Sequence, residues 1–208
     1  DLTFTSLGTE VTGNPFGMAS AVTFKGSGEL DNGWTYGLTI AHGDKDVYSA
    51  SNIDIVMGGF GSINFNQGNS GNGIAAYDNV MPTAWEETHG TGASSGVDTI
   101  TGVHGSAAIQ WSAAADMLPM GTSLAIAYSP KADGGGLQAD LGNSGDLNNE
   151  MESGWDIVVQ SGLGIDGLNI FGGSSVIEKT GTGEAEDKQE HTFGATYAVG
   201  AVTVGYQE

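Results

Sequence analysis

The residues of this chain that could do chemistry are mostly carboxylates. There are 25 Asp and Glu against five Lys in 208 residues, with no Arg, which gives a formal net charge of -20. Three of the acids, Asp78, Glu86 and Glu87, belong to "AAYDNVMPTAWEETHG", residues 75–90, whose helix-forming residues differ from the Gly- and Thr-rich surroundings. Pro82 suits the first turn of a helix, so we expect a short helix there. In a narrow aqueous passage these acids would attract cations and repel anions, whereas on a surface loop they would only be solvated.

Patterns typical of enzymes are weak in this sequence. "GASSG", residues 92–96, matches Gly-x-Ser-x-Gly, but it lacks the preceding strand and following helix that a nucleophile elbow needs. The four His are scattered without metal-ligand spacing, and the absence of Cys excludes thiolate sites and disulfides. We therefore expect no catalytic residues and no metal or other cofactor. Calcium binding at acidic loops remains open, because carboxylates are its preferred ligands.

The composition also excludes several classes of partner. A nucleic-acid binder needs a basic patch, and binding to an anionic membrane surface by charge needs clustered Lys or Arg. No apolar stretch approaches the length of a transmembrane helix. The chain begins at Asp1 and not at Met, which we interpret as a processed protein or a fragment.

The elements that must position these acids are β-strands, because apolar and polar residues alternate with period two through most of the chain. In 22–30 the residues Val22, Phe24 and Leu30 share one face, and the Asn32-Gly33 pair that follows is a tight-hairpin signal. The same pattern predicts ten strands in five antiparallel hairpins, around 22–30 and 34–41, 53–57 and 63–65, 109–113 and 124–128, 155–163 and 168–170, and 193–197 and 202–206.

The connections between these strands alternate in length. Short turns join the two strands of each hairpin, while long polar stretches near 43–51, 66–105, 131–153 and 179–189 join one hairpin to the next. Outer-membrane barrels show this alternation, with an apolar face toward lipid and a polar face toward the lumen. Aromatic residues near strand ends, such as Trp34 and Trp155, fit interfacial girdles. On the polar phase of the strands, and hence on the expected pore wall, lie Lys25, Glu29, Asp54 and Asp156.

Two stretches carry a resemblance to a known family. "AVTFKGSGELDNGWTYGLTIAHG" and "IDIVMGGFGSINFNQG" resemble the early strands of general porins from alphaproteobacteria, including the turn at 59–61. "AYDNVMPTAWEE" stands where the third loop of that family would be. The resemblance spans Ala21 to Tyr206 and is specific in about the first hundred residues. It implies a sixteen-stranded, usually trimeric, water-filled transmembrane β-barrel whose third loop folds inward, opposite basic wall residues, with calcium sites in some members.

The sequence also departs from that family. Ten strands are too few, the wall arginines are absent, and the chain stops directly after a strand, so we interpret it as an incomplete piece of a single barrel domain spanning 1–208. Residues 1–17 are expected to form an external loop and 66–105 the constriction loop. Within that loop the resemblance predicts acids at the constriction, Asp78, Glu86 and Glu87, and residues that anchor the loop to the wall, Tyr77, Met81 and Trp85.

The function predicted from this resemblance is a general diffusion porin and not an enzyme. It would be a homotrimer in contact with outer-membrane lipid of a Gram-negative bacterium, passing small hydrophilic solutes and ions, with a preference for cations. An alternative prediction is a secreted or cell-surface acidic protein, a calcium-stabilised adhesin or surface-layer module. That alternative explains the acids and the missing Cys equally well, but it does not explain the alternation of connection lengths.

Overall fold

The computed structural model describes residues 2–4, 16–18, 21–43, 50–67, 71–78, 80–81, 100–103, 107–132, 151–179 and 186–208. Within these ranges the regular structure is β-strand apart from three short 3-10 helices. None of the described helices has the length and apolar character needed to cross a membrane.

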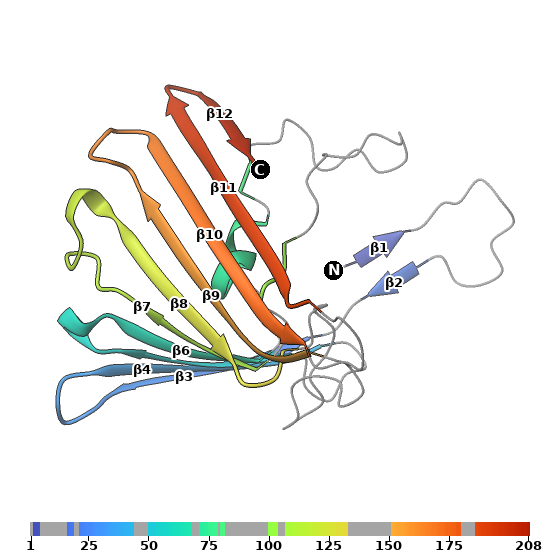
Figure 1. The fold of residues 1–208 in the computed structure, drawn as a ribbon. Helices are drawn as coiled ribbons and strands as arrows, with labels where there is room; N and C mark the ends of the chain where they lie inside the picture. Colours follow the sequence, from blue (N-terminus) through green and yellow to red (C-terminus); the bar gives the residue numbers. More distant parts are fainter. Residues whose placement is uncertain are drawn as a thin grey trace, which may run out of the picture.

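The main element is a ten-stranded antiparallel sheet in which every strand pairs with its neighbours in the sequence (Figure 1). In order, the strands are β3 (Val22–Glu29), β4 (Thr35–His42), β5 (Ala50–Val56), β6 (Ser62–Gln67), β7 (Ala108–Ser112), β8 (Ser123–Ser129), β9 (Met151–Ser161), β10 (Leu168–Lys179), β11 (Lys188–Val199) and β12 (Val202–Gln207). The predicted all-β, up-and-down arrangement of ten strands is therefore confirmed. The sheet is not closed, since β3 and β12 form its two edges.

Tight turns set the register of the hairpins. Between β3 and β4, Gly33 has φ 80°, and the Leu30 N–H donates to the Trp34 carbonyl at 2.7 Å. The Asn32 side chain accepts the Trp34 N–H at 3.1 Å, as expected for an Asn-Gly turn. The helices η1 (Gly58–Phe60) and η3 (Pro119–Gly121) form the connections of β5 to β6 and of β7 to β8. Because these turns are short, they hold the alternating faces of successive strands in phase.

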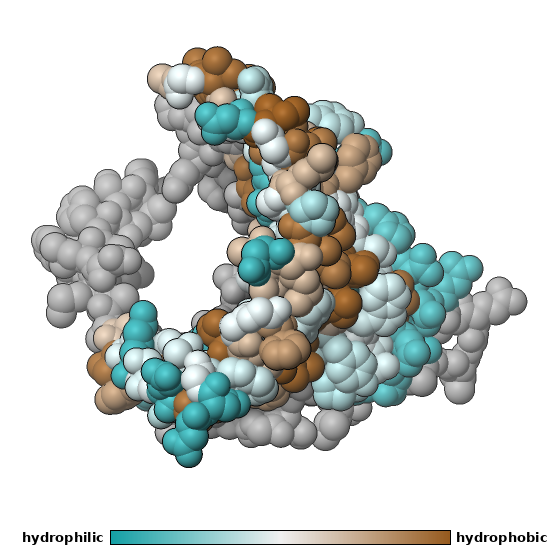
Figure 2. All heavy atoms as spheres, turned by 90° about the vertical axis from the view of Figure 1, so that its left-hand side faces the viewer, coloured by the Kyte–Doolittle hydropathy of each residue, from teal (hydrophilic) through white to brown (hydrophobic). Residues whose placement is uncertain are grey.

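One face of the sheet is apolar and exposed. A continuous row of paired positions on this face runs from β4 to β9 through Leu38, Ile53, Phe65, Ile109, Tyr128 and Trp155. Phe65 and Trp155 are each 46% exposed, and the same face of β12 carries exposed Val202, Val204 and Tyr206. Seen end-on in Figure 2, the sheet follows an arc whose outer, convex side carries much of this hydrophobic surface. An exposed apolar surface of this width is unusual for a soluble monomer.

The opposite, concave face is polar and carries the described part of the long connection between β6 and β7. We call residues 71–78, 80–81 and 100–103 the docked segment. It includes the helix η2 (Gly73–Tyr77), which lies against β8, β9, β10 and β11 (Figure 1). Two small clusters of buried apolar residues form where this segment meets the sheet. The first contains Val103, Ala108, Ala127, Ala132 and Ile177, and the second contains Ile74, Tyr77, Val158 and Phe171.

Of two further predicted features, one is not described by the structure and the other differs. The short helix predicted to begin at Pro82 lies outside the described residues, and the described helix, η2, comes earlier in the connection. Residues 1–17 were predicted as a loop, but β1 (Leu2–Phe4) pairs there with β2 (Phe16–Met18), which ends one residue beyond it, in a separate two-stranded sheet. Three-residue strands are too short to show a period-two pattern in the sequence, so this pairing was not predicted.

Candidate functional site

A row of side chains crosses the concave face at right angles to the strands. Its members occupy paired positions on neighbouring strands from β6 to β11, in the order Asn64, Gln110, Ala127, Asp156, Ser175 and Glu190. We call Asn64, Gln110, Asp156 and Glu190 the anchoring row, because each accepts a hydrogen bond from the docked segment. Such a row arises because period-two side chains in register bring polar positions of successive strands side by side.

Three consecutive residues of the docked segment, 72–74, follow this row across the sheet. The hydrogen bonds run from Asn72 Nδ2 to Asn64 Oδ1 (3.1 Å), from the Gly73 N–H to Gln110 Oε1 (2.7 Å) and from the Ile74 N–H to Asp156 Oδ2 (3.0 Å). The segment therefore runs perpendicular to the strands. The backbone N–H groups of Gly73 and Ile74, at the start of η2, are satisfied by side chains of the wall.

Asp156 holds two separate parts of the docked segment, residues 71–78 and residues 100–103. Besides the Ile74 N–H, its carboxylate accepts the Val103 N–H, which lies 3.3 Å from each of its two oxygens. The side chain is 0% exposed, and Ile74 and Val103 are also 0% exposed. A buried carboxylate is tolerated when several donors satisfy it, and charge-assisted bonds to backbone N–H groups are among the stronger ones.

Glu190 provides a second carboxylate anchor, separated from Asp156 in the row by Ser175 of β10. It accepts the Gly102 N–H at 2.8 Å and the Thr101 N–H at 3.2 Å. Lys188 lies 3.1 Å from the same carboxylate and donates to Thr101 Oγ1 at 3.0 Å. Residues 101–103 are therefore held by two carboxylates on β9 and β11, and one lysine balances part of their charge.

Two glycines allow the backbone to approach Asp156 this closely. Gly73 has φ 61° and Gly102 has φ 53°, in the left-handed region that side chains disfavour. A Cβ atom at either position would collide with the Asp156 carboxylate. The sequence requires glycine at both positions for the same reason, although they are far apart in the chain.

Tyr77 ties the end of η2 to the more distant strands. Its ring stacks on Phe171 with centroids 4.6 Å apart, and its hydroxyl donates to Gln160 Oε1 at 2.6 Å. Gln207 Nε2, on β12, donates to the Tyr77 carbonyl at 2.7 Å. Burial raises the pKa of the Tyr77 hydroxyl above its ordinary value, because the charged phenolate would lose hydration there.

The residues predicted for the constriction loop are only partly described. Asp78 is half-buried, and its Oδ1 accepts the Ile100 N–H at 3.3 Å. This hydrogen bond joins the 71–78 part of the docked segment to the 100–103 part. Met81 packs against the cluster around Ile74 and Tyr77. The other three residues predicted for this loop, Trp85, Glu86 and Glu87, lie outside the described residues.

The residues predicted for the wall have different surroundings. Lys25 and Glu29 are exposed on the polar face of β3, and neither takes part in an ion pair with the other in the described part of the structure. Positions four apart on a strand are about 13 Å apart, too far for contact. Asp156, predicted for the pore wall, is covered by the docked segment. Asp54 is half-buried and forms part of a polar network described next.

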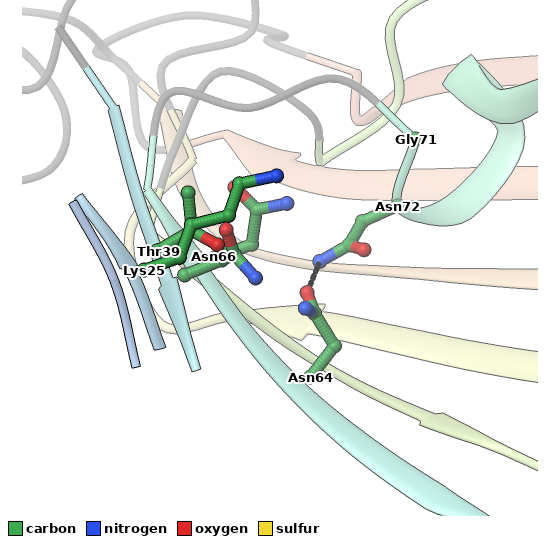
Figure 3. Close-up of a pocket in the computed structure, with 7 residues that line it drawn as sticks. Lys25, Thr39, Asn64, Asn66, Gly71 and Asn72 are labelled. Atoms are coloured by element: carbon green, nitrogen blue, oxygen red, sulfur yellow. Dashed lines mark hydrogen bonds between the residues drawn. The ribbon is translucent and has the colours of Figure 1, made fainter. Parts of the chain in front are cut away.

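A polar pocket lies beside the anchoring row, over β3 to β6 (Figure 3). Its volume is about 410 Å³, and its lining consists of Lys25, Thr39, Asn52, Asn64, Asn66, Gly71 and Asn72. Behind the lining, Asp54 accepts hydrogen bonds from Asn52 Nδ2 and Asn64 Nδ2, each 2.6 Å long. The pocket is therefore bounded mainly by carboxamides that are held in place by a carboxylate.

Several of these functional positions were not singled out from the sequence. Gln110, Glu190 and Gln207 contact the docked segment but were not predicted as site residues. A signal existed, since each stands on the polar phase of its strand. Only the register between strands, however, reveals which polar positions share a row.

No family model, curated protein or solved structure matches this chain. Among the described residues, no group of three or more His, Asp or Glu is placed to hold a metal ion. The fold and the site define an all-β protein: an antiparallel up-and-down sheet with an exposed apolar face and a polar face. A loop segment is fixed to the polar face by carboxylates and carboxamides, of which Asp156 is fully buried.

Proposed function

We propose that this chain forms part of the wall of a transmembrane β-barrel porin, a diffusion channel of a Gram-negative outer membrane. The observation that carries the proposal is the arrangement of the two faces. The convex face exposes apolar side chains across the sheet, while polar side chains and a fixed loop segment occupy the concave face. This arrangement is the reverse of that in a water-soluble protein, which has its apolar side chains inside and its polar side chains outside. Lipid around the convex face and an aqueous lumen at the concave face would suit both faces.

The docked segment would then narrow the passage. It is tied to β6, β7, β9, β11 and β12, so it is held inside the arc of the sheet. Small hydrophilic solutes would pass beside it down their concentration gradients. The 25 acids against five lysines favour cations in such a passage.

A membrane-spanning wall also needs its edges covered. Unpaired N–H and C=O groups on β3 and β12 would each cost several kcal/mol in hydrocarbon. The proposal therefore includes strands additional to these ten, up to the sixteen of the family that the sequence resembles, and assembly as a homotrimer.

The test is electrical. Protein isolated from outer membranes in detergent is reconstituted into planar bilayers, with a tenfold KCl gradient across the membrane. We expect discrete conductance steps and a reversal potential of the sign that indicates K⁺ preference. A protein that dissolves fully without detergent and produces no conductance would contradict the proposal and support the secreted, calcium-stabilised alternative. Conductance with anion preference would overturn the selectivity alone.

A further inference from the structure

The polar pocket is built from one row of side chains on four successive strands. Lys25 of β3 pairs with Thr39 of β4, Thr39 with Asn52 of β5, and Asn52 with Asn66 of β6. Neighbouring positions of this kind lie about 5 Å apart on the same face, so the row offers polar groups along roughly 15 Å. Figure 3 shows Asn72 of the docked segment facing this row from the opposite side of the pocket.

Lys25 supplies the charge of the pocket. Elsewhere in the described structure, Lys131 lies 3.3 Å from Glu152, and Lys188 lies 3.1 Å from Glu190. The ammonium of Lys25 has no ion pair or hydrogen bond with any described residue, and its side chain is exposed to the pocket. In a chain with five acids for every lysine, a lysine that lacks a carboxylate partner leaves its charge available to a ligand.

The carboxamides supply oriented donors and acceptors. Asp54 fixes Asn64 through Asn64 Nδ2, and Asn64 Oδ1 in turn accepts Asn72 Nδ2 at 3.1 Å. These bonds assign the amide orientations and prevent the side chains from turning away. Each carboxamide has two N–H donors and two lone pairs, so Asn64 and Asn72 keep groups for a ligand after these bonds are made.

We propose that this pocket binds a small monoanionic carboxylate that also carries several hydroxyl groups. The ligand carboxylate lies against the Lys25 ammonium, and its hydroxyls exchange hydrogen bonds with Thr39 and with the carboxamides of Asn64 and Asn72. A neutral polyol leaves the ammonium uncompensated. A multiply charged anion brings further negative charge close to Asp54, in a chain that is already strongly acidic.

This site goes beyond the proposed channel function and does not need conduction to be observed. In a channel wall it would face the lumen and retard one class of solute, while the overall acidic field still favours cations. Binding is therefore measured on detergent-solubilised protein, so failure of the binding test and failure of the conductance test are separate results.

The experiment is isothermal titration calorimetry at low ionic strength with three probes: gluconate, glucose and acetate. Gluconate has both the carboxylate and the hydroxyls, glucose only the hydroxyls, and acetate only the charge. We expect gluconate to bind at least about tenfold more tightly than either of the others. Equal affinity for glucose would overturn the role of the charge, equal affinity for acetate would overturn the role of the carboxamides, and no heat with gluconate would overturn the site.

Two variants and one control locate the site. Lys25→Gln should weaken gluconate binding at least about tenfold, and Asn72→Ala should weaken gluconate binding while leaving acetate binding unchanged. Lys179→Gln removes the same charge from the end of β10, where that lysine has no ion pair with a described residue, and should leave gluconate binding unchanged. Equal losses in Lys25→Gln and Lys179→Gln would show an effect of net charge and refute the assignment.

Discussion

Replacing Asp156 by alanine is expected to release the docked segment from the sheet. The substitution removes the acceptor of two buried donors, the N–H groups of Ile74 and Val103, at 3.0 and 3.3 Å. Each N–H left buried without a partner costs about 1–3 kcal/mol, so the bound position loses about 2–6 kcal/mol. The segment avoids this cost by moving away from the wall, because water then satisfies both N–H groups.

Amide hydrogen exchange measures this release directly, because Ile74 and Val103 exchange slowly only while they are docked. A loss of 2 kcal/mol corresponds to about a thirtyfold rise in their exchange rates, given that 1.4 kcal/mol is a factor of ten. The matched control is Glu178→Ala. It removes a carboxylate from β10 whose hydrogen-bond partner is the Ser153 hydroxyl, at 3.1 Å, and not the docked segment. If Asp156→Ala leaves both exchange rates within about threefold of wild type, then Asp156 does not hold the segment and the reasoning is wrong.

Three further predictions concern the same segment. Gly73→Ala should raise the exchange rates of the docked amides next to it. Gly200, in the turn between β11 and β12, has the same φ of 61° but open space around its Cβ, so Gly200→Ala should not raise the exchange rates of the amides next to it. Equal local effects of the two substitutions would show that backbone strain alone is responsible. Glu190→Gln should raise Gly102 exchange only about fivefold, because a neutral acceptor still bonds the N–H but loses about 1 kcal/mol; a change above about a hundredfold would contradict this. Burial raises the pKa of Tyr77, so docking contributes stability that is complete below the ordinary tyrosine pKa of about 10 and is lost as pH rises through the raised value. A tyrosinate absorbance titration of Tyr77→Phe should therefore lose one tyrosine's worth of late-titrating absorbance, and an unchanged late amplitude in that variant would refute the assignment.

The strands were predictable because their signals are local. Period-two alternation in 22–30, followed by Asn32-Gly33, is sufficient to specify a hairpin, and the register in the structure agrees with it. The same alternation predicts which residues share a face, so Lys25, Asp54 and Asp156 were correctly placed on the polar side. The short turns within each hairpin then make the up-and-down order of strands the simplest arrangement.

The site was less predictable because it depends on contacts between distant parts of the chain. The role of Asp156 requires knowing that Gly73 and Gly102 both lie against it, and no local pattern in the sequence links these three positions. Glu190 had the correct phase on its strand but no feature that separated it from other polar positions. The same limit explains why the docked segment was not predicted to cover Asp156.

The anchoring row also sets an order of events in folding. Three of the bonds that hold the docked segment connect residues 82 positions apart from Ile74 to Asp156, 88 from Gly102 to Glu190 and 130 from Tyr77 to Gln207. Each hairpin, in contrast, closes between residues that are near neighbours in the chain. Contacts of such long range form late, because the entropy of closing the intervening chain must first be offset by other structure. The concave face is therefore expected to remain uncovered until β11 and β12 have joined the sheet.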